Sequence, residues 1–315
     1  MPRIGVTSEF EIIRRFFDRP APGALLGVGD DAALVAPRAG LQLAVSTDLL
    51  LEGRHFRAGA DPRKLGHKAL AVNLSDMAAM GATPRWATLA IALPAADEAW
   101  LAAFADGLFA LAARHGTDLI GGDTTRGALA ICITILGEVP AGAALLRSGA
   151  RPGDDIWVSG ELGGAALALA HPEIAAALQR LEEPEPRVTL GEGLRGLASA
   201  AIDVSDGFAQ DLVHILERSG CGARVDYDRL PRAAAFAQLG DAALERSCVL
   251  GGGDDYELLF TAPPPARGAL EALARGLGLA LTRVGRMVPG AATLELHDTA
   301  GRRMAPARGY DHFAP

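Results

Sequence analysis

The stretch DPRKLGHKALAVNLSDMAAMGATPRWATLAIALP, residues 61–94, joins a helix pattern directly to a strand pattern. Asp61 is typical of a helix N-cap, Pro62 of the first helical position and Gly81 of a C-terminal stop. Residues 85–94 then form a short apolar run that ends at a proline, as buried strands do. A helix that leads straight into a buried strand favours a fold in which helices cover a sheet.

The same alternation continues in both directions from this stretch. Strands are expected at 41–51, 118–123, 127–139, 154–160, 201–206, 222–228, 250–263 and 279–288. Helices are expected at 97–116, 165–171, 207–220 and 266–278, with a short linker at 182–187. Glycine, proline and charged residues interrupt the pattern near residue 148. We therefore expect an α/β (α+β) protein with two domains, residues 1–148 and 149–315.

Length and composition restrict the class of protein. A chain of 315 residues is long enough for two domains. Its net charge of -8, without a basic stripe, argues against a nucleic-acid partner. No apolar run reaches the roughly 18 residues that cross a bilayer, and the N-terminus lacks the order of a secretory signal. The three cysteines have no CxxC spacing, as in reduced cytoplasmic proteins. The sequence thus predicts a cytoplasmic protein with no membrane partner.

Asp76 is the first residue that indicates chemistry. It lies in a row of the predicted helix whose members follow the three-four spacing of one face: Leu65, Ala69, Val72, Asp76 and Ala79. Burying an unpaired carboxylate costs several kcal/mol, so this position needs a partner or a metal ion. The alternative is a helix-end aspartate that reaches solvent past Met77. The sequence leaves both interpretations open.

Five more aspartates occupy similar places. Asp48, Asp123 and Asp203 lie in or at the ends of predicted strands, Asp206 begins a helix, and Asp30 follows Gly29. A single strand-end aspartate is usually a helix cap, but open α/β sheets bind ligands at their strand ends. Carboxylates about 4 Å apart repel by about 4 kcal/mol at an effective dielectric near 20, which cations relieve. Oxygen ligands without a histidine or cysteine group select Mg²⁺, and Mg²⁺ favours phosphate oxygens. A nucleoside triphosphate is the natural co-ligand.

Other nucleotide and hydrolase motifs are missing from the sequence. It contains no GxxxxGK[ST], no VAIK, HRD or DFG set, no GxSxG and no HExxH. The turn GELGG at 160–164 has the glycines of a phosphate cradle, although such turns more often only connect a strand to a helix. Arg147 has the charge to neutralise a phosphate, or is a surface arginine. Asp31 is expected to support the turn that holds Asp30, and PGDDIWV (152–158) to be an ordinary turn into a strand.

Seven motifs taken together resemble the thiamine-monophosphate kinase family. They are GVGDDAAL (27–34), STDLLLEGRHF (46–56), KALAVNLSDMAAMGATPR (68–85), IGGDTTRG (120–127), RSGARPGDDIWVSG (147–160), AIDVSDG (201–207) and GGGDDYELLF (251–260). The resemblance runs from Ser8 to the RGYDHF segment at 308–313, which is nearly the whole chain. This family belongs to the ATP-binding superfamily of aminoimidazole ribonucleotide synthetase.

The resemblance implies an aminoimidazole ribonucleotide synthetase-like fold. In such a fold the N-terminal domain pairs with a second copy to form a barrel-like sheet, and a C-terminal α/β domain follows. It also implies direct transfer of the γ-phosphoryl group of ATP to thiamine monophosphate, giving thiamine diphosphate and ADP with the help of several Mg²⁺ ions. The implied Mg²⁺ ligands are Asp30, Thr47, Asp48, Asp76, Asp123, Asp203 and Asp206, with Ser46 assisting. The implied ATP contacts are Gly122, Asp123, Arg147 and Ser205, and the implied substrate contacts are His55, Asp254 and Tyr310.

The chemistry of this reaction agrees with the residues present. The acceptor is a phosphate whose second pKa is about 6, so it is already ionised near neutral pH and needs no general base. The protein's work is to position two anions and neutralise their charge. For the substrate side, plainer interpretations stay open: His55 as a loop histidine, Asp254 as a turn residue and Tyr310 as a residue that packs the C-terminal segment onto its domain.

Rival functions differ in recognisable features. Selenide water dikinase carries a reactive cysteine near its N-terminus, whereas this chain has none before Cys132. The related hydrogenase maturation protein ends in a cysteine, whereas this chain ends in HFAP. Aminoimidazole ribonucleotide synthetase itself fits STDLLLEGRHF and GGGDDYELLF less well. A non-catalytic Mg²⁺-nucleotide sensor could lose its acidic residues freely, and this chain has all of them.

Overall fold

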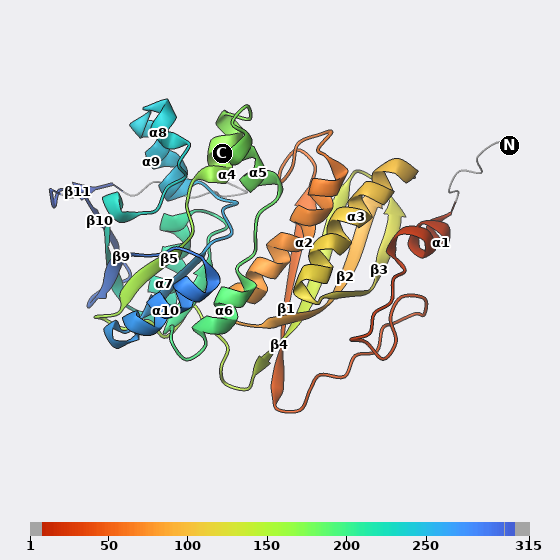
Figure 1. Ribbon diagram of the computed structural model, residues 1–315, viewed down its shortest axis with the longest axis horizontal. Helices are drawn as coiled ribbons and strands as arrows, with labels where there is room; N and C mark the ends of the chain where they lie inside the picture. Colours follow the sequence, from red (N-terminus) through yellow and green to blue (C-terminus); the bar gives the residue numbers. More distant parts are fainter. Residues whose placement is uncertain (1–7, 299, 306–315) are drawn as a thin grey trace. The chain divides into compact units, whose positions relative to one another are not determined.

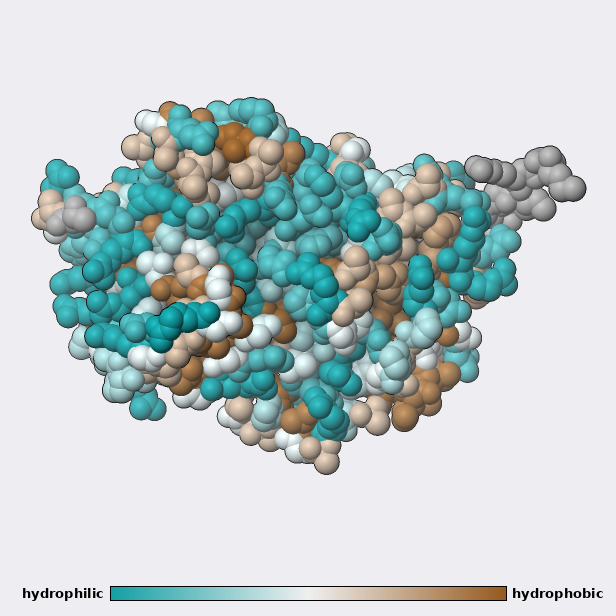
Figure 2. Space-filling model, in the orientation of Figure 1, coloured by the Kyte–Doolittle hydropathy of each residue, from teal (hydrophilic) through white to brown (hydrophobic). Residues whose placement is uncertain are grey.

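The computed structural model describes residues 8–298 and 300–305 and divides into two compact units (Figure 1). The first unit comprises Met1–Met77 and Ala82–Ala141, and the second comprises Ala78–Gly81 and Gly142–Pro315. In the described part of the chain, no helix combines the length and apolar character needed to cross a membrane. The side of the molecule drawn in Figure 2 is largely hydrophilic, with apolar residues in small separate groups.

The first unit is a four-stranded sheet with helices on one face. Its strands are β1 (Leu41–Leu51), β2 (Thr83–Leu93), β3 (Asp118–Arg126) and β4 (Ala130–Pro140), in the order β1-β4-β2-β3. β4 is antiparallel to both β1 and β2, whereas β2 and β3 are parallel. The helices α2 (Pro62–Ala79) and α3 (Glu98–His115) lie side by side over the sheet in Figure 1. The short helices α1 (Glu9–Ile12) and η1 (Ile13–Phe17) precede them.

Local signals in the sequence explain both long helices. The Asp61 carboxylate accepts hydrogen bonds from the backbone N–H groups of Arg63 and Lys64 at 2.8 and 3.2 Å, which confirms the predicted N-cap of α2. Gly116 ends α3 in the left-handed region at φ 61°, as predicted. The capped helices bury the apolar face of the sheet, which includes Leu89, Ile91 and Ile133.

The two long helices touch each other through their backbones. A Cβ atom on Gly107 of α3 would lie 1.8 Å from the carbonyl oxygen of Arg63 on α2. A Cβ atom on Gly66 of α2 would lie 2.0 Å from the carbonyl oxygen of Phe104 on α3. Neither position has room for a side chain, so these glycines determine how closely α2 approaches α3.

The opposite face of the sheet carries exposed apolar side chains from β1. Leu43, Val45, Leu49 and Leu51 are 42%, 60%, 51% and 38% exposed. The sequence predicted the bounds of this strand correctly, but its description as a buried strand is wrong for this face. Strand side chains alternate in direction, and only the alternate set faces α2 and α3.

The described residues of the second unit form a seven-stranded mixed sheet. Its order is β11-β10-β7-β9-β5-β8-β6. The strands are β5 (Asp155–Ser159), β6 (Ala200–Asp203), β7 (Gly222–Asp226), β8 (Leu258–Ala262), β9 (Leu281–Val288), β10 (Leu294–His297) and β11 (Arg303–Met304). The helices are α4 (Gly164–Ala170), α5 (Ala175–Glu182), α6 (Val188–Leu194), α7 (Phe208–Ser219), α8 (Phe236–Leu239), α9 (Ala242–Gly251) and α10 (Arg267–Leu277), with the short turns η2 (Tyr227–Arg229) and η3 (Pro264–Ala266).

Most predicted elements of this unit are present, and the segment PGDDIWV is a turn into β5 as expected. Its second aspartate has a structural partner that the sequence did not indicate. Asp155 is 3% exposed and accepts hydrogen bonds from Arg267 Nε at 2.5 Å and Arg283 Nη1 at 3.3 Å. Burial acts to raise the pKa of Asp155, but the two guanidinium groups hold it below its usual value.

Candidate functional site

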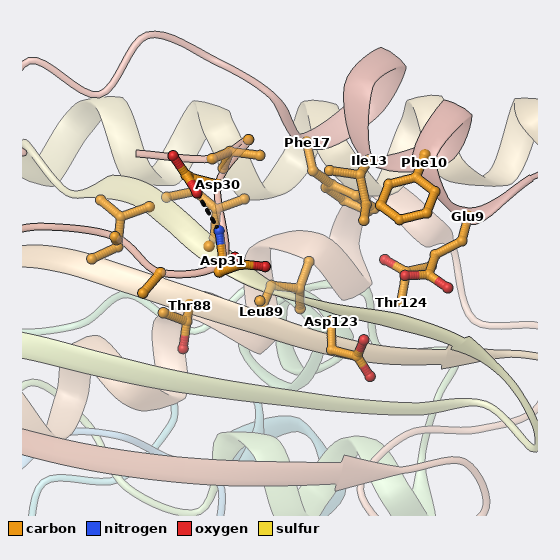
Figure 3. A pocket seen from close by; sticks show the side chains of 18 residues that line it. Glu9, Phe10, Ile13, Phe17, Asp30, Asp31, Thr88, Leu89, Asp123 and Thr124 are labelled. Atoms are coloured by element: carbon orange, nitrogen blue, oxygen red, sulfur yellow. Dashed lines mark hydrogen bonds between the residues drawn. The ribbon is translucent and has the colours of Figure 1, made fainter. Parts of the chain in front are cut away.

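A pocket of about 550 Å³ in the first unit contains three of the predicted site residues, Asp30, Gly122 and Asp123. Figure 3 shows Asp30 on the loop before β1 and Asp123 on β3, with Phe10, Ile13 and Phe17 of α1 and η1 along another side. The pocket lining thus combines acidic side chains with apolar ones. Such a pocket suits a ligand with a flat apolar end and a metal-bound anionic end.

The turn at Asp30 is made by its neighbours. Gly29 has a φ of 120°, which a side chain would disfavour. The carboxylate of Asp30 accepts a hydrogen bond from the backbone N–H of Asp31 at 2.9 Å, drawn as a dashed line in Figure 3. Asp31 therefore supports the turn as expected, and it does so through its backbone N–H. This hydrogen bond fixes the orientation of the Asp30 carboxylate relative to the turn.

Gly122 brings β3 close to β2. A Cβ atom at this position would lie 1.8 Å from the carbonyl oxygen of Leu89, so a side chain would push the two strands apart. In the register of the two parallel strands, Asp123 lies opposite Ala90, on the face not covered by helices. The packing of β3 against β2 thus requires a glycine at position 122, in addition to the nucleotide contact that the resemblance implies.

Ser46 of the sheet and Asp76 of the helix layer are in direct contact. The Ser46 hydroxyl of β1 donates a hydrogen bond to Oδ2 of Asp76 on α2. Asp76 is partly buried, so this bond resolves the two interpretations of its position in favour of a polar partner. The pair holds two candidate oxygen ligands at the interface of β1 and α2.

The residues Ser46, Thr47 and Asp48 do not face one direction. Asp48 lies opposite Ile133 in the register, on the helix-covered face with Ser46. Thr47 lies on the other face, where its hydroxyl is 2.8 Å from Thr134 Oγ1. One ion therefore cannot bind all three side chains, and Thr47 could join Ser46 and Asp48 only through its backbone oxygen.

His55 is fixed beside the end of β1. Its Nδ1 accepts a hydrogen bond from the backbone N–H of Leu51 at 2.9 Å. A neutral ring with Nδ1 accepting carries its proton on Nε2. The ring is therefore oriented by its own loop, with Nε2 as the donor.

In the second unit, Asp203 and Asp206 flank a tight turn between β6 and α7. Asp203 is 4% exposed at the end of β6. The carboxylate of Asp211, in the first turn of α7, accepts from the backbone N–H groups of Ser205, Asp206 and Gly207. Burial, followed by the charges of Asp203 and Asp206, raises the pKa of Asp211 to about 8. The sequence analysis missed Asp211, although an acidic residue in the first turn of a helix is a recognised signal.

Asp254 has a strained backbone. Its φ is 65°, an unusual value for a residue other than glycine, and Tyr256 has a φ of 51°. The Tyr256 hydroxyl donates to Asp254 Oδ1 at 3.0 Å. A Cβ atom on Gly253 would lie 2.3 Å from the carbonyl oxygen of Ser205, so the two backbone segments approach closely here. Tyr256 is a second residue that sequence reasoning missed.

Three N–H groups of the GELGG turn, those of Gly160, Leu162 and Gly163, already donate hydrogen bonds within the protein. Asp255, which is 7% exposed, accepts from the Gly163 N–H at 2.7 Å and from the Ala165 N–H at 3.4 Å. The turn is therefore a connection between β5 and α4 that a neighbouring carboxylate holds. These hydrogen bonds favour the plainer of the two interpretations.

Asp255 should make the stability of the protein depend on pH. Burial raises its pKa from 3.8 to about 8, so the folded state holds a proton that the unfolded state releases near pH 4. Between these two values the unfolded state binds fewer protons, so the contribution of Asp255 to stability falls as the pH rises. Urea unfolding from pH 5 to 9 should show this fall in the wild type and a flatter profile in Asp255→Asn. Identical profiles would contradict the assignment.

The remaining predicted residues lie apart from these contacts or outside the described residues. Arg147 is exposed, and its carbonyl oxygen accepts from Ser219 Oγ at 3.1 Å. Tyr310 lies outside the described residues. Within residues 8–298 and 300–305, no three side chains of the histidine, cysteine, aspartate and glutamate types gather closely enough to hold a metal ion.

Comparisons with known proteins cover nearly the whole chain. Residues 29–139 match the AIR synthase related protein, N-terminal domain, and residues 151–296 match the corresponding C-terminal domain. The thiamine-monophosphate kinase of Salmonella typhimurium is 47% identical over 97% of this chain and 98% of its own length. The crystal structure of thiamine-monophosphate kinase from Stenotrophomonas maltophilia K279a is 48% identical, with a TM-score of 0.83, and the alignment covers 94% of this chain and 96% of that one.

A further structure, AaThiL complexed with AMPPCP and TMP, is 29% identical with a TM-score of 0.76 and covers 88% of this chain and 89% of that one. Both matched domain models lie in the order expected from the sequence motifs. The chain belongs to the thiamine-monophosphate kinase family, within the AIR synthase related proteins.

Proposed function

We propose that this protein transfers the γ-phosphoryl group of ATP to thiamine monophosphate, forming thiamine diphosphate and ADP in thiamine diphosphate biosynthesis. The observation that carries the proposal is the pocket of the first unit, where Asp30, Gly122 and Asp123 line one cavity in a chain of this family. The relative complexed with AMPPCP and TMP supports both substrates, because AMPPCP is an analogue of ATP. Such a kinase works in the cytoplasm, where ATP is available.

The donor atoms suit Mg²⁺. Aspartate carboxylates and serine and threonine oxygens are hard ligands, and the Ser46–Asp76 hydrogen bond already joins two of them. In the first unit Asp30, Thr47, Asp48, Asp76 and Asp123 would hold Mg²⁺ with Ser46, and Asp203 and Asp206 would do so in the second. When bound, the metal neutralises charge on the phosphates. Among the described residues no three acidic side chains of this set gather closely enough to hold a metal ion, so phosphate oxygens would complete the coordination.

The chain's own groups position the two substrates. Gly122, Asp123, Arg147 and Ser205 are the proposed ATP contacts, and Arg147 supplies a positive charge for a phosphate. His55, Asp254 and Tyr310 are the proposed thiamine monophosphate contacts. The Tyr256 hydroxyl holds the Asp254 carboxylate, and the Leu51 N–H holds the His55 ring. The ionised acceptor phosphate attacks in line, so no residue needs to act as a general base.

The reaction can be tested directly. The full chain is incubated with Mg-ATP and thiamine monophosphate, and ADP and thiamine diphosphate are quantified by mass spectrometry. The proposal requires the two products to rise together in equal amounts. ADP without thiamine diphosphate, or ATP binding without turnover, would favour a nucleotide sensor or another reaction of the superfamily.

We also propose that residues 1–148 form the nucleotide-binding and dimerisation domain, and that two copies pair through the open face of its sheet. The exposed side chains Leu43, Val45, Leu49 and Leu51 lie in one row along β1. A row of apolar side chains on an uncovered sheet face is typical of an interface. The twofold pairing that the family resemblance implies would cover this row.

Val45→Glu should convert a dimer to a monomer. The substitution places a charge in the centre of the apolar row, where pairing would bury it without a partner. Sedimentation or light scattering measures the mass of the wild type and the variant. Leu169→Glu is a matched control, because Leu169 is also 60% exposed but lies on α4 of the second unit. A monomeric wild type, or a dimeric Val45→Glu variant, would contradict the proposal.

A further inference from the structure

Asp211 is an acidic residue that the proposed reaction does not use. It lies in the first turn of α7 and is 2% exposed. A single oxygen, Oδ2, accepts the backbone N–H groups of Ser205, Asp206 and Gly207, each at 3.1 Å. Three consecutive N–H groups that point at one atom form a tight turn, and this turn joins the proposed ligands Asp203 and Asp206.

The other side of the same turn is held by a second segment of the chain. The Val204 N–H donates to the Glu257 carbonyl at 2.8 Å, and the Tyr256 N–H donates to the Val204 carbonyl at 2.9 Å. The Asp254 N–H donates to the Ser205 carbonyl at 2.9 Å. The turn is thus fixed by backbone pairing on one side and by one buried carboxylate on the other.

Little space is left for the turn to relax. Gly207 has a φ of 117°, and a Cβ atom there would lie 2.8 Å from the carbonyl carbon of Gly251. Because backbone pairing and this contact hold one side, loss of the acceptor would free the three N–H groups on the other. The side chains of Ser205 and Asp206 would move with them.

We infer that Asp211 is a positioning residue that sets the directions of Asp203, Ser205 and Asp206 for the metal and the nucleotide while contacting neither. This inference rests on the proposed function for the roles of those three residues. The hydrogen bonds themselves do not depend on the charge of Asp211, because an uncharged carboxyl or amide oxygen also accepts from N–H groups. Geometry, and not charge, is therefore what Asp211 contributes.

Two substitutions separate geometry from charge. Asp211→Asn removes the charge and keeps an acceptor oxygen at the same distance along the side chain. Asp211→Glu keeps the charge and lengthens the side chain by one methylene at a position that is only 2% exposed. We expect Asp211→Glu to lower kcat about 100-fold and Asp211→Asn to stay within about threefold of the wild type, because a misplacement of about 1 Å costs that much. Arg218→Ala, at an exposed position of the same helix, controls for effects of the helix.

Two measurements without substrates identify the cause. Hydrogen exchange should be faster at the Ser205, Asp206 and Gly207 amides in Asp211→Glu than in Asp211→Asn, while amides elsewhere in α7 stay protected. Titration with Mg²⁺ alone should show weaker binding in Asp211→Glu. If Asp211 only stabilised the fold, both variants would have a lower unfolding midpoint. Their amide exchange and Mg²⁺ binding would then not differ in the order described.

The inference is overturned if Asp211→Glu keeps more turnover and more Mg²⁺ affinity than Asp211→Asn, since charge would then be the contribution. It is also overturned if amide exchange of the turn is unchanged in both variants. If the wild type forms no thiamine diphosphate, the proposed function fails, while the exchange and Mg²⁺ titrations still decide whether Asp211 positions the turn.

Discussion

Asp123→Asn should lower turnover about 100- to 1000-fold at saturating Mg²⁺, as the loss of one charge-stabilising group does in other active sites. Asp123 lines the pocket of the first unit together with Asp30. The amide keeps the size of the side chain, but it loses the negative charge that binds the cation. The strand itself should be unaffected, because Gly122, and not Asp123, makes the close contact with β2.

The measurement is the initial rate of thiamine diphosphate formation, with the unfolding midpoint measured in parallel. Asp228→Asn serves as the control, because Asp228 is an exposed residue of η2 with no proposed role in the reaction. Near-normal turnover of Asp123→Asn would remove Asp123 from the metal-binding set. A large loss of stability would instead make it a structural residue.

Glu257→Ala should reduce the stability of the second unit by about 3 kcal/mol, because it leaves a largely buried arginine without its partner. Glu257 is 1% exposed and accepts from Arg187 Nε and Nη2 at 2.7 and 2.6 Å. It also accepts from Ser159 Oγ at 2.6 Å. Although burial acts to lower the pKa of Arg187, Glu257 holds it above its usual value.

Urea unfolding of the variant and the wild type measures this effect. Glu295→Ala is the matched control, since Glu295 also pairs with an arginine, Arg224 at 3.1 Å, but at the surface. Exposed ion pairs contribute little, so the control should unfold nearly as the wild type does. Equal effects of the two substitutions would mean that burial does not decide the strength of the Glu257 pair.

The parts of the fold that could be predicted from the sequence are those that short-range patterns determine. Asp61, Pro62 and Gly116 act within one helical turn, and the helices that they bound lie where the sequence indicates. The helices α8 and α9, the edge strand β11 and its neighbour β10 were missed. Their bounds depend on tertiary packing, which overrides the weak preferences of short segments.

For the candidate site, the sequence predicted the types of the residues better than the directions in which their side chains point. The alternation of β1 turns Thr47 away from Ser46 and Asp48, although the three are consecutive. The partner of Asp76 is a serine 30 positions earlier in the chain. The role of Asp211 becomes visible only when three backbone N–H groups are seen to converge on one oxygen.

The contact between α2 and α3 has a consequence for variation in this family. Gly66 and Gly107 allow the two backbones to touch, and Asp76 lies on the same helix as Gly66. An alanine at either glycine would lift α2 away from α3 and alter the path of the helix that presents Asp76 to Ser46. Sequence changes that preserve every acidic residue can therefore still inactivate the protein, and two positions without side chains deserve inclusion when natural variants are judged for activity.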